Sequence, residues 1–165
     1  MPQFLNPFEK PAYFEQALFL YTKYSKFLDD DYASNGMSPY DYFLNLVMKT
    51  LFFVIVEDCE VVGFVYLDNF IGDSERFHSA EITTCFDRRV WGDYTKICGR
   101  IFLDHCFEKY GLKKIKALVY PENFRVTTLM KSIGFEKEAL LKAETMRNNK
   151  LQDIEVYACY NKLKG

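Results

Sequence analysis

The chain lacks any pattern of cysteine and histidine that would bind a metal or build a disulfide framework. Its five cysteines are scattered without a CxxC pair, and only His78 and His105 accompany them. Structural zinc sites need paired ligands at short spacing, and small secreted domains need cysteines in disulfide pairs. The sequence therefore predicts reduced cysteines that pack as small apolar side chains, and it predicts no metal site.

Membrane, export and linker signals are also missing. Residues 1–10 lack a basic segment followed by an apolar core, and no apolar run is long enough to cross a bilayer. No linker rich in proline, glycine or serine interrupts the chain, and a net charge of -2 gives no overall attraction to nucleic acid or anionic lipid. We expect a cytoplasmic protein with one domain over residues 1–165, and with neither nucleic acid nor membrane as a partner.

What the chain does contain is apolar and aromatic material. Of its 165 residues, 49% are hydrophobic, and sixteen Phe and twelve Tyr carry most of an aromatic share of 18%. This length is enough for one well-packed core. The composition predicts a globular protein with large side chains available to line a cleft.

The pattern of apolar residues predicts alternating helices and strands. Residues 12–28 repeat apolar side chains at helical spacing, and Ser38 with Pro39 is typical of the start of a helix that would run to about Lys49. The remaining predicted elements are strands 51–56, 61–67 and 78–86, helix 94–110, strand 114–120, helix 123–133 and strands 136–147 and 151–160, with a short strand near Phe4.

Turn residues separate these elements. Asp58-Cys59 and Asn148-Asn149 are expected to reverse two hairpins, and Gly111 and Gly134 are expected to end the two later helices. A loop containing Gly72-Asp73-Ser74 precedes the third strand. The resulting order, α-α-β-β-β-α-β-α-β-β, predicts an α/β (mixed α+β) fold with a mixed sheet flanked by helices.

The junction from Ala80 to Tyr94 is the most informative segment. A strand-like run passes through Arg88, Arg89 and Gly92 into a helix. Glycine permits close approach of the backbone, and the first amides of a helix are unpaired donors at its positive end. The junction therefore predicts a site for an anion such as a pyrophosphate, although a glycine that merely allows the chain to turn is an equally good interpretation.

This order of elements resembles the GCN5-related N-acetyltransferase (GNAT) superfamily. The resemblance covers residues 51–160 and rests on the turn at Gly92, on Val119-Tyr120-Pro121-Glu122-Asn123 and on Ser132-Ile133-Gly134-Phe135. Trp91-Gly92 is similar to the subgroup that acts on ribosomal-protein N-termini. The resemblance implies a mostly antiparallel central sheet and acetyl transfer from acetyl-CoA to a primary amine of a protein N-terminus, a lysine or a small molecule.

The resemblance also implies how acetyl-CoA is held. The pantetheine arm would lie along the strand from Glu81 to Phe86, the pyrophosphate would bind the amides of the turn, and the strands would splay at Phe86 and Val119. The implied cofactor-binding residues are Thr84, Cys85, Phe86, Arg89, Val90, Trp91, Gly92, Asp93, Tyr94, Thr95 and Asn123. Tyr94 departs from the family by replacing a small residue, and Asn123 is interpreted equally well as an ordinary helix N-cap.

Proton transfer is assigned to Glu81. It begins the strand that would face the thioester, as a glutamate does in the histone-modifying branch, although a solvated charge is the alternative. Met130 stands where many members of the family have a tyrosine that protonates the thiolate. Cys85 suggests a covalent route, but a cysteine in a strand is usually inert. The base requirement is lighter for an N-terminal amine than for a lysine.

The acceptor amine is expected between the first two helices and the last hairpin. There Asp29 to Asp31 would attract a cation, and aromatic side chains would form the wall: Tyr24, Phe27, Tyr32, Tyr40, Tyr42 and Phe43. The competing hypothesis is a binding or regulatory module without catalysis, in which the altered turn binds CoA poorly. Either a monomer or a homodimer is compatible with the sequence.

Overall fold

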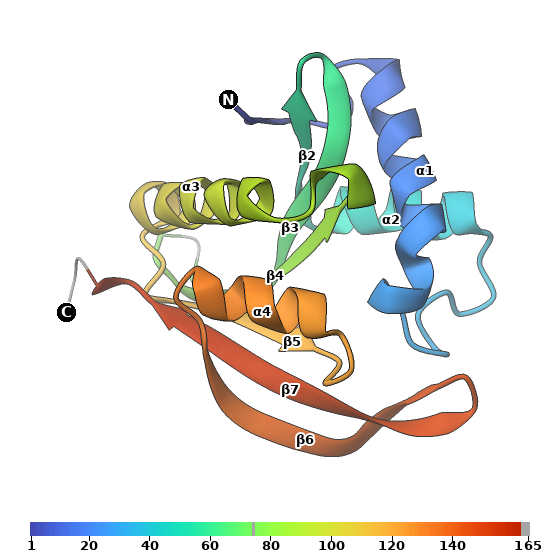
Figure 1. Cartoon of the computed structure of the whole chain (residues 1–165), viewed down its shortest axis with the longest axis vertical. Coiled ribbons are helices and arrows are strands. Elements are labelled where there is room, and N and C mark those ends of the chain that lie inside the picture. The colour runs from blue at the N-terminus through green and yellow to red at the C-terminus, as the bar shows by residue number, and fades with distance from the viewer. Residues whose placement is uncertain (74, 163–165) are drawn as a thin grey trace. The chain divides into compact units, whose positions relative to one another are not determined.

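The structure is a computed structural model that describes residues 1–73 and 75–162. Its elements are β1 (Gln3–Leu5), α1 (Pro11–Leu28), α2 (Pro39–Lys49), β2 (Leu51–Glu57), β3 (Glu60–Gly72), β4 (Phe77–Phe86), the short 3-10 helix η1 (Arg88–Val90), α3 (Asp93–Tyr110), β5 (Lys114–Val119), α4 (Phe124–Ser132), β6 (Glu136–Arg147) and β7 (Lys150–Tyr160). This confirms the predicted order. Ser74, in the predicted loop, lies outside the described residues (Figure 1).

The strands form one sheet in the order β1-β2-β3-β4-β5-β7-β6. The pairs β1–β2, β2–β3 and β5–β7 are antiparallel, whereas β4 and β5 are parallel, with Ser79 opposite Lys114 and Glu81 opposite Lys116. A mixed, mostly antiparallel sheet with helices was predicted, and it is confirmed. The splaying of the strands expected at Phe86 and Val119 stays a prediction.

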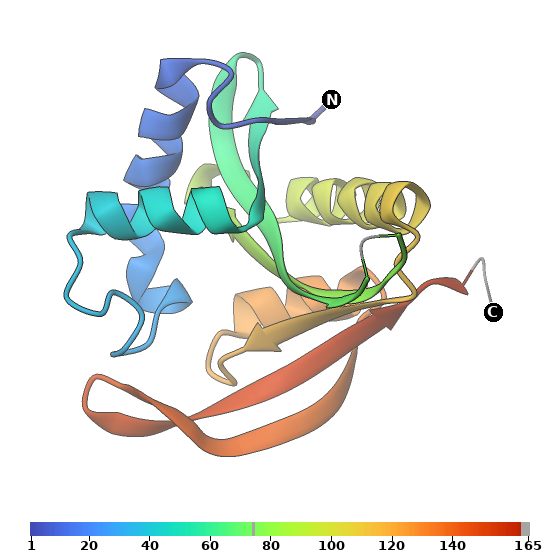
Figure 2. The ribbon, with the colours of Figure 1, turned by 180° about the vertical axis from the view of Figure 1, so that it is seen from behind.

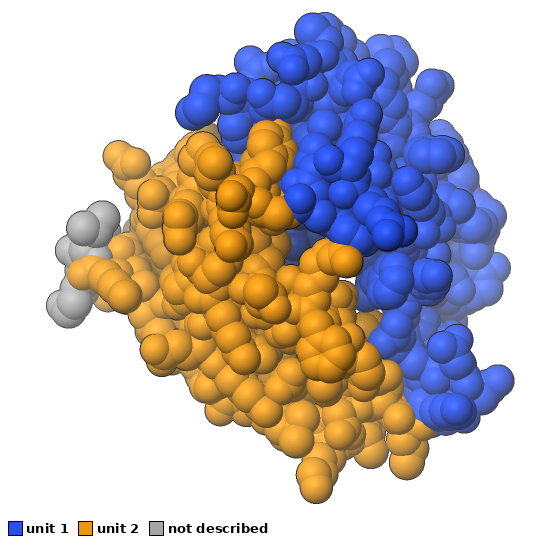
Figure 3. Space-filling model, viewed as in Figure 1, with its two compact units in different colours: residues 1–67, 83–91, 146–150 blue, residues 68–82, 92–145, 151–165 orange. Residues whose placement is uncertain are grey.

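The chain divides into two compact units (Figure 3). Unit 1 comprises residues 1–67, 83–91 and 146–150, and unit 2 comprises residues 68–82, 92–145 and 151–165. The strands β3 and β4 contribute residues to both. The expectation of one domain over residues 1–165 stays a prediction.

Unit 1 is built around aromatic side chains between its helices and its strands. Helix α1 contacts α2 and β2, and α2 also contacts β2 (Figure 2). Phe43 of α2 is fully buried, with its ring centroid 5.1 Å from that of Tyr21 and 5.6 Å from those of Phe14 and Phe52. Burial of these rings stabilises unit 1.

The α1–α2 loop in unit 1 holds the tip of the β6–β7 hairpin. The backbone amides of Asn148 and Asn149 each donate to the Asp31 carboxylate at 2.9 Å, and the Asp31 amide donates to the carbonyl of Met146 at 2.9 Å. Asn148 and Asn149 have φ values of 52° and 61°, as a tight hairpin turn requires. The predicted turn is confirmed, and it is joined to a segment 117 residues earlier in the sequence.

Unit 2 contains α3, α4 and the strands beside them. Helix α4 contacts α3 and β5. Large side chains from these elements and from the α3–β5 loop are fully buried, among them Phe102, Leu112, Ile115 and Met130. Helix α3 ends at Gly111, whose φ of 63° is in the left-handed region. The predicted end of this helix is therefore confirmed.

Candidate functional site

The end of β4 brings three of the predicted cofactor-binding residues into unit 1. Thr84 is half-buried, whereas Cys85 and Phe86 are buried. Burial, and then the charge of Asp87, raises the pKa of the Cys85 thiol to about 12. Because the thiolate is the reactive form, this cysteine is a poor nucleophile, which argues against a covalent route.

Asp87, the residue after β4, fixes the start of the following turn. Its amide donates to the carbonyl of Val62 at 2.8 Å, and its carboxylate accepts from the Tyr24 hydroxyl at 3.1 Å and from Lys23 Nζ at 3.4 Å. Burial acts to raise the pKa of Asp87, but the hydrogen bonds from Tyr24 and Lys23 and the nearby cations outweigh it and lower that pKa. Asp87 is therefore a charged anchor that joins the turn to α1 and β3.

Tyr24 also accepts from the Arg88 amide at 2.8 Å, so that one hydroxyl binds two successive residues of the turn. We predict that Tyr24→Phe lowers the free energy of unfolding by about 1–2 kcal/mol, because Asp87 loses a donor and the Arg88 amide loses its acceptor. Urea denaturation measures this loss. The matched control is Tyr13→Phe, since Tyr13 is buried on the same helix and its hydroxyl has no partner among the described residues. Equal losses in both variants would show that the Tyr24 hydroxyl does not hold the turn.

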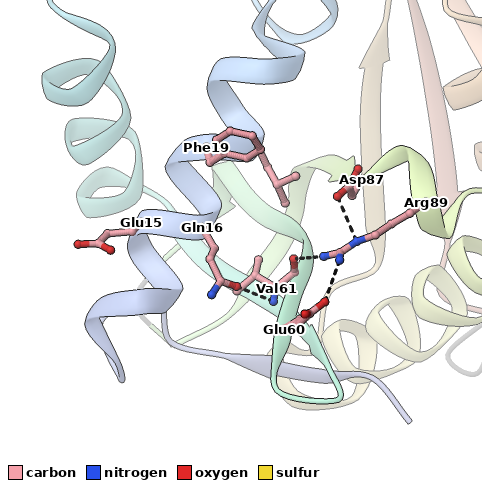
Figure 4. A pocket seen from close by; sticks show the side chains of 8 residues that line it. Glu15, Gln16, Phe19, Glu60, Val61, Asp87 and Arg89 are labelled. Atoms are coloured by element: carbon pink, nitrogen blue, oxygen red, sulfur yellow. Dashed lines mark hydrogen bonds and ion pairs between the residues drawn. The ribbon is translucent and has the colours of Figure 1, made fainter.

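Arg89 is directed at the β2–β3 hairpin (Figure 4). Its guanidinium contacts Glu60 Oε2 at 2.8 Å and Asp87 Oδ2 at 3.1 Å, and it donates to the carbonyl of Val61 at 3.0 Å. These groups line a cavity of about 390 Å³ in unit 1. These contacts hold the turn against the hairpin, and the predicted contact of Arg89 with an anion stays a prediction.

Val90 and Trp91 complete the turn in unit 1. Val90 ends η1, and the indole Nε1 of Trp91 donates to the carbonyl of Phe86 at 3.0 Å. The ring of Trp91 lies 6.2 Å from that of Tyr24 and under the Arg88 guanidinium at 5.7 Å. The Trp91 side chain therefore closes the turn back onto the end of β4.

Gly92 begins the part of the turn that belongs to unit 2. Its φ of 119° and ψ of -138° lie in a region that is almost confined to glycine. Apart from Gly92 and its two chain neighbours, no atom of the described residues lies within 4 Å of the place where a Cβ would stand. Thr95 donates to the Gly92 carbonyl through its amide at 3.1 Å and through its hydroxyl at 2.7 Å. The polar groups of Thr95 thus shape the turn.

Asp93 and Tyr94 are the first residues of α3. Asp93 is exposed, as a carboxylate at the positive end of a helix should be, and it pairs with Lys96 at 3.7 Å. Tyr94, at the place where the family has a small residue, is half-buried. Tyr94 does not disturb the start of the helix, because α3 is regular from Asp93.

Asn123 and Met130 belong to α4 and its cap. The Asn123 side-chain oxygen accepts from the Val126 amide at 3.4 Å, which is the N-cap role that the sequence left open. Met130 is only 1% exposed, so it serves as core packing. Neither side chain supplies a proton donor for a leaving thiolate.

Glu81 is half-buried on β4, opposite Lys116 of β5. The structure adds Asp68 of β3, which the sequence analysis missed. Burial, and then the charge of Glu81, raises the pKa of Asp68 from its ordinary value of 3.8 to about 6. An aspartate that directly follows the apolar run Val61–Leu67 was the signal that could have identified it.

A second cavity in unit 1, of about 380 Å³, lies where the acceptor was predicted. It is lined in part by Asp29, Asp30, Asp31, Tyr42 and Arg147. Burial is the main cause that raises the pKa of Asp29, whose carboxylate accepts a short hydrogen bond from Tyr21. The other predicted wall residues are not part of its lining. Tyr24 binds Asp87, Phe43 is in the core, and Phe27, Tyr32 and Tyr40 are exposed.

Two negative findings concern the described residues alone. Among residues 1–73 and 75–162, no group of His, Cys, Asp and Glu side chains is arranged to hold a metal ion. Within the same ranges, no helix combines the length and the apolar character that a bilayer span requires.

The comparison with protein families gives a match to the family described as Acetyltransferase (GNAT) domain, over residues 14–136. The comparison with curated proteins finds no match.

Solved structures share the fold. Ribosomal-protein-S5-alanine acetyltransferase from Vibrio fischeri is 16% identical with a TM-score of 0.75, and the alignment covers 98% of this chain and 92% of that chain. Spermidine N-acetyltransferase from Vibrio cholerae, in complex with CoA and spermine, is 21% identical with a TM-score of 0.74, covering 97% and 94%. RimJ of Mycobacterium smegmatis, in complex with CoA-disulfide, is 26% identical with a TM-score of 0.65, covering 78% and 68%.

Proposed function

We propose, from the premise that this chain belongs to the GNAT acetyltransferase family and is an acyltransferase, that it transfers the acetyl group of acetyl-CoA to a primary amine by direct attack. The observation that carries the proposal is the turn from β4 into α3, where the glycine-only conformation of Gly92 immediately precedes the helix. This turn lies within the residues that the family model matches.

The residues of the turn fit acetyl-CoA. The space where a Gly92 Cβ would stand is open, so a phosphate can approach the backbone closely. The first amides of α3 lie at the positive end of an 18-residue helix, which suits an anion. We assign anion binding to the backbone of Gly92, Asp93 and Tyr94, and we assign Arg89 and Thr95 to the shaping of the turn.

The proposal also includes the other contacts with acetyl-CoA that the sequence predicted. The strand residues Thr84, Cys85 and Phe86 would lie along the pantetheine arm, next to Val90 and Trp91 of the turn, and the Asn123 amide group would contact the same arm. When bound, acetyl-CoA supplies the thioester carbonyl that the amine attacks. A backbone amide at the end of β4 would stabilise the negative charge that develops on that carbonyl oxygen.

The acceptor must lose a proton before it attacks. At pH 7 a lysine amine is neutral in roughly one molecule in two thousand, whereas an N-terminal amine with a pKa near 8 is neutral in roughly one molecule in ten. Glu81 would take this proton, directly or through water. Because a thiol has a pKa of about 8.5, the thiolate can leave without a dedicated acid, which is consistent with Met130 in α4.

The negative charge of the second cavity indicates the class of the acceptor. The cavity with Asp29, Asp30 and Asp31 supports an amine that arrives as a cation, and the named activities of the Vibrio proteins concern a ribosomal-protein alanine and spermidine. We propose that the acceptor is a protein N-terminus or a cationic small-molecule amine. A panel of N-terminal peptides, lysine peptides and polyamines distinguishes these acceptors.

Binding of acetyl-CoA tests the proposal directly. A ligand at 100 times its dissociation constant stabilises the folded state by about 2.7 kcal/mol, so we predict that the melting temperature rises by roughly 5–10 °C. Thermal unfolding with and without millimolar acetyl-CoA measures this rise, and acetate at the same concentration is the control. The absence of any shift at millimolar acetyl-CoA would overturn the proposed function.

A further inference from the structure

Asp68 is a half-buried carboxylate whose burial has no structural compensation. Within the described residues, its side chain forms neither a hydrogen bond nor an ion pair. Burial of an unpaired charge destabilises a fold, so a carboxylate without a partner is not explained by stability. Perturbed carboxylates of this kind are concentrated at functional sites.

A second carboxylate lies beside it. In the sheet, β3 is the neighbour of β4, and the charge of Glu81 on β4 acts on Asp68. Glu81 is also half-buried and has no hydrogen bond or ion pair within the described residues. Two like charges on adjacent strands repel each other, so the charge of Glu81 makes the Asp68 carboxyl harder to ionise.

The cations of this part of unit 2 do not neutralise the pair. Lys116 is the register partner of Glu81, but the two side chains form no ion pair. Lys114, two residues earlier on β5, binds Glu138 at 2.6 Å. The two carboxylates therefore lie on neighbouring strands, the charge of Glu81 acts on Asp68, and Lys116 is the register partner of Glu81.

The backbone at Asp68 is also irregular. The next residue, Asn69, has a φ of 50°, within a strand that otherwise continues to Gly72. Residues in the left-handed region interrupt the regular alternation of a strand and are frequent near active sites. The pKa of Asp68 near 6, caused first by burial and then by Glu81, is consistent with proton transfer close to neutral pH.

We propose that Asp68 and Glu81 form a carboxylate pair that accepts the proton of the acceptor amine, with Asp68 as the positioning residue that acts through Glu81. This inference rests on the proposed acetyl transfer. The acceptor ammonium gives one proton to the pair, and the neutral amine forms the C–N bond as the C–S bond breaks. The second proton of the amine nitrogen goes to the departing thiolate, and the pair then releases its proton to water.

The test is the pH dependence of kcat/KM in the full-length protein. We expect kcat/KM of the native protein to decrease as the pH falls through about 6, which is the acidic limb of its pH profile. In Asp68→Asn, the limb should move to lower pH, because the carboxyl with the raised pKa is gone, and kcat/KM at neutral pH should fall roughly tenfold. The matched control is Asp104→Asn, an exposed position on α3 that loses the same charge. A lower rate with an unmoved limb would overturn the proposal, because a merely structural role changes the rate alone.

Carboxyl ¹³C NMR between pH 4 and 8 makes the test independent of turnover. We expect the Asp68 signal to show an inflection near pH 6 that Glu81→Gln moves to lower pH, and an Asp68 inflection that Glu81→Gln leaves unmoved would overturn the pair. Circular dichroism establishes that the variant is folded. If acetyl-CoA gave no thermal shift but the Asp68 titration depended on Glu81, the proposed function would be rejected and the pair would stand. If the protein transferred acetyl groups but the Asp68 titration did not depend on Glu81, only the pair would be rejected.

Discussion

Gly92→Ala is expected to weaken the binding of acetyl-CoA by roughly five- to 150-fold. A non-glycine residue at a φ of 119° and a ψ of -138° costs about 1–3 kcal/mol. If the turn relaxes in the free protein, binding must restore the strain, and the cost reduces affinity. If the turn does not relax, the same cost lowers the free energy of unfolding. Isothermal calorimetry measures the loss of affinity, and urea denaturation measures the loss of stability.

The matched control is Gly111→Ala at the other end of α3. Gly111 also has a positive φ, 63°, and within the described part of the chain only its own atoms and those of its two chain neighbours lie within 4 Å of where a Cβ would stand. The substitution should cost about 1–2 kcal/mol of stability, with no change in the dissociation constant of acetyl-CoA. If Gly92→Ala changed neither affinity nor stability, the conformation of the turn and its proposed role would both be wrong.

Phe43→Ala is expected to remove about 3–5 kcal/mol from the free energy of unfolding. The side chain is fully buried, and its ring lies within 5.8 Å, centroid to centroid, of the rings of Phe14, Tyr21, Phe52 and Phe64. Truncation leaves a cavity among rings that cannot collapse without losing their mutual contacts. Because whole domains are stable by about 5–15 kcal/mol, this is a large share of the total.

Phe19→Ala on α1 is the control, since its ring is 67% exposed. Its effect should lie within about 0.5 kcal/mol, as measured by urea denaturation of both variants. Similar losses at Phe19 and Phe43 would contradict the arrangement of the aromatic core.

The local elements could be predicted because their signals are local. Ser38 accepts from the Asp41 amide and Pro39 opens α2, as the sequence indicated. The pair Asp58 and Cys59, with φ values of 49° and 66°, reverses the β2–β3 hairpin as predicted. In each case the residue type carries its own conformational preference, whatever the rest of the chain does.

The partners of charged side chains could not be predicted in the same way. The strand expected to end at Leu67 continues to Gly72, because Asp68 and Asn69 have the composition of a loop and yet extend β3. Arg89 was assigned to an anion from its place in a motif, whereas its contacts with Glu60 and Val61 depend on a hairpin 28 residues away. Contacts between segments that are distant in the sequence leave no repeating residue pattern from which they could be predicted.

The tether between Asp31 and the β6–β7 turn has a consequence for biosynthesis. Domains tend to fold from the N-terminus as the ribosome releases the chain. Unit 1 includes residues 146–150, so its contacts cannot be complete until the chain has been translated through residue 150. A ribosome that stalls before Asn148 would therefore hold a nascent chain whose α1–α2 loop still lacks the amides that bind Asp31.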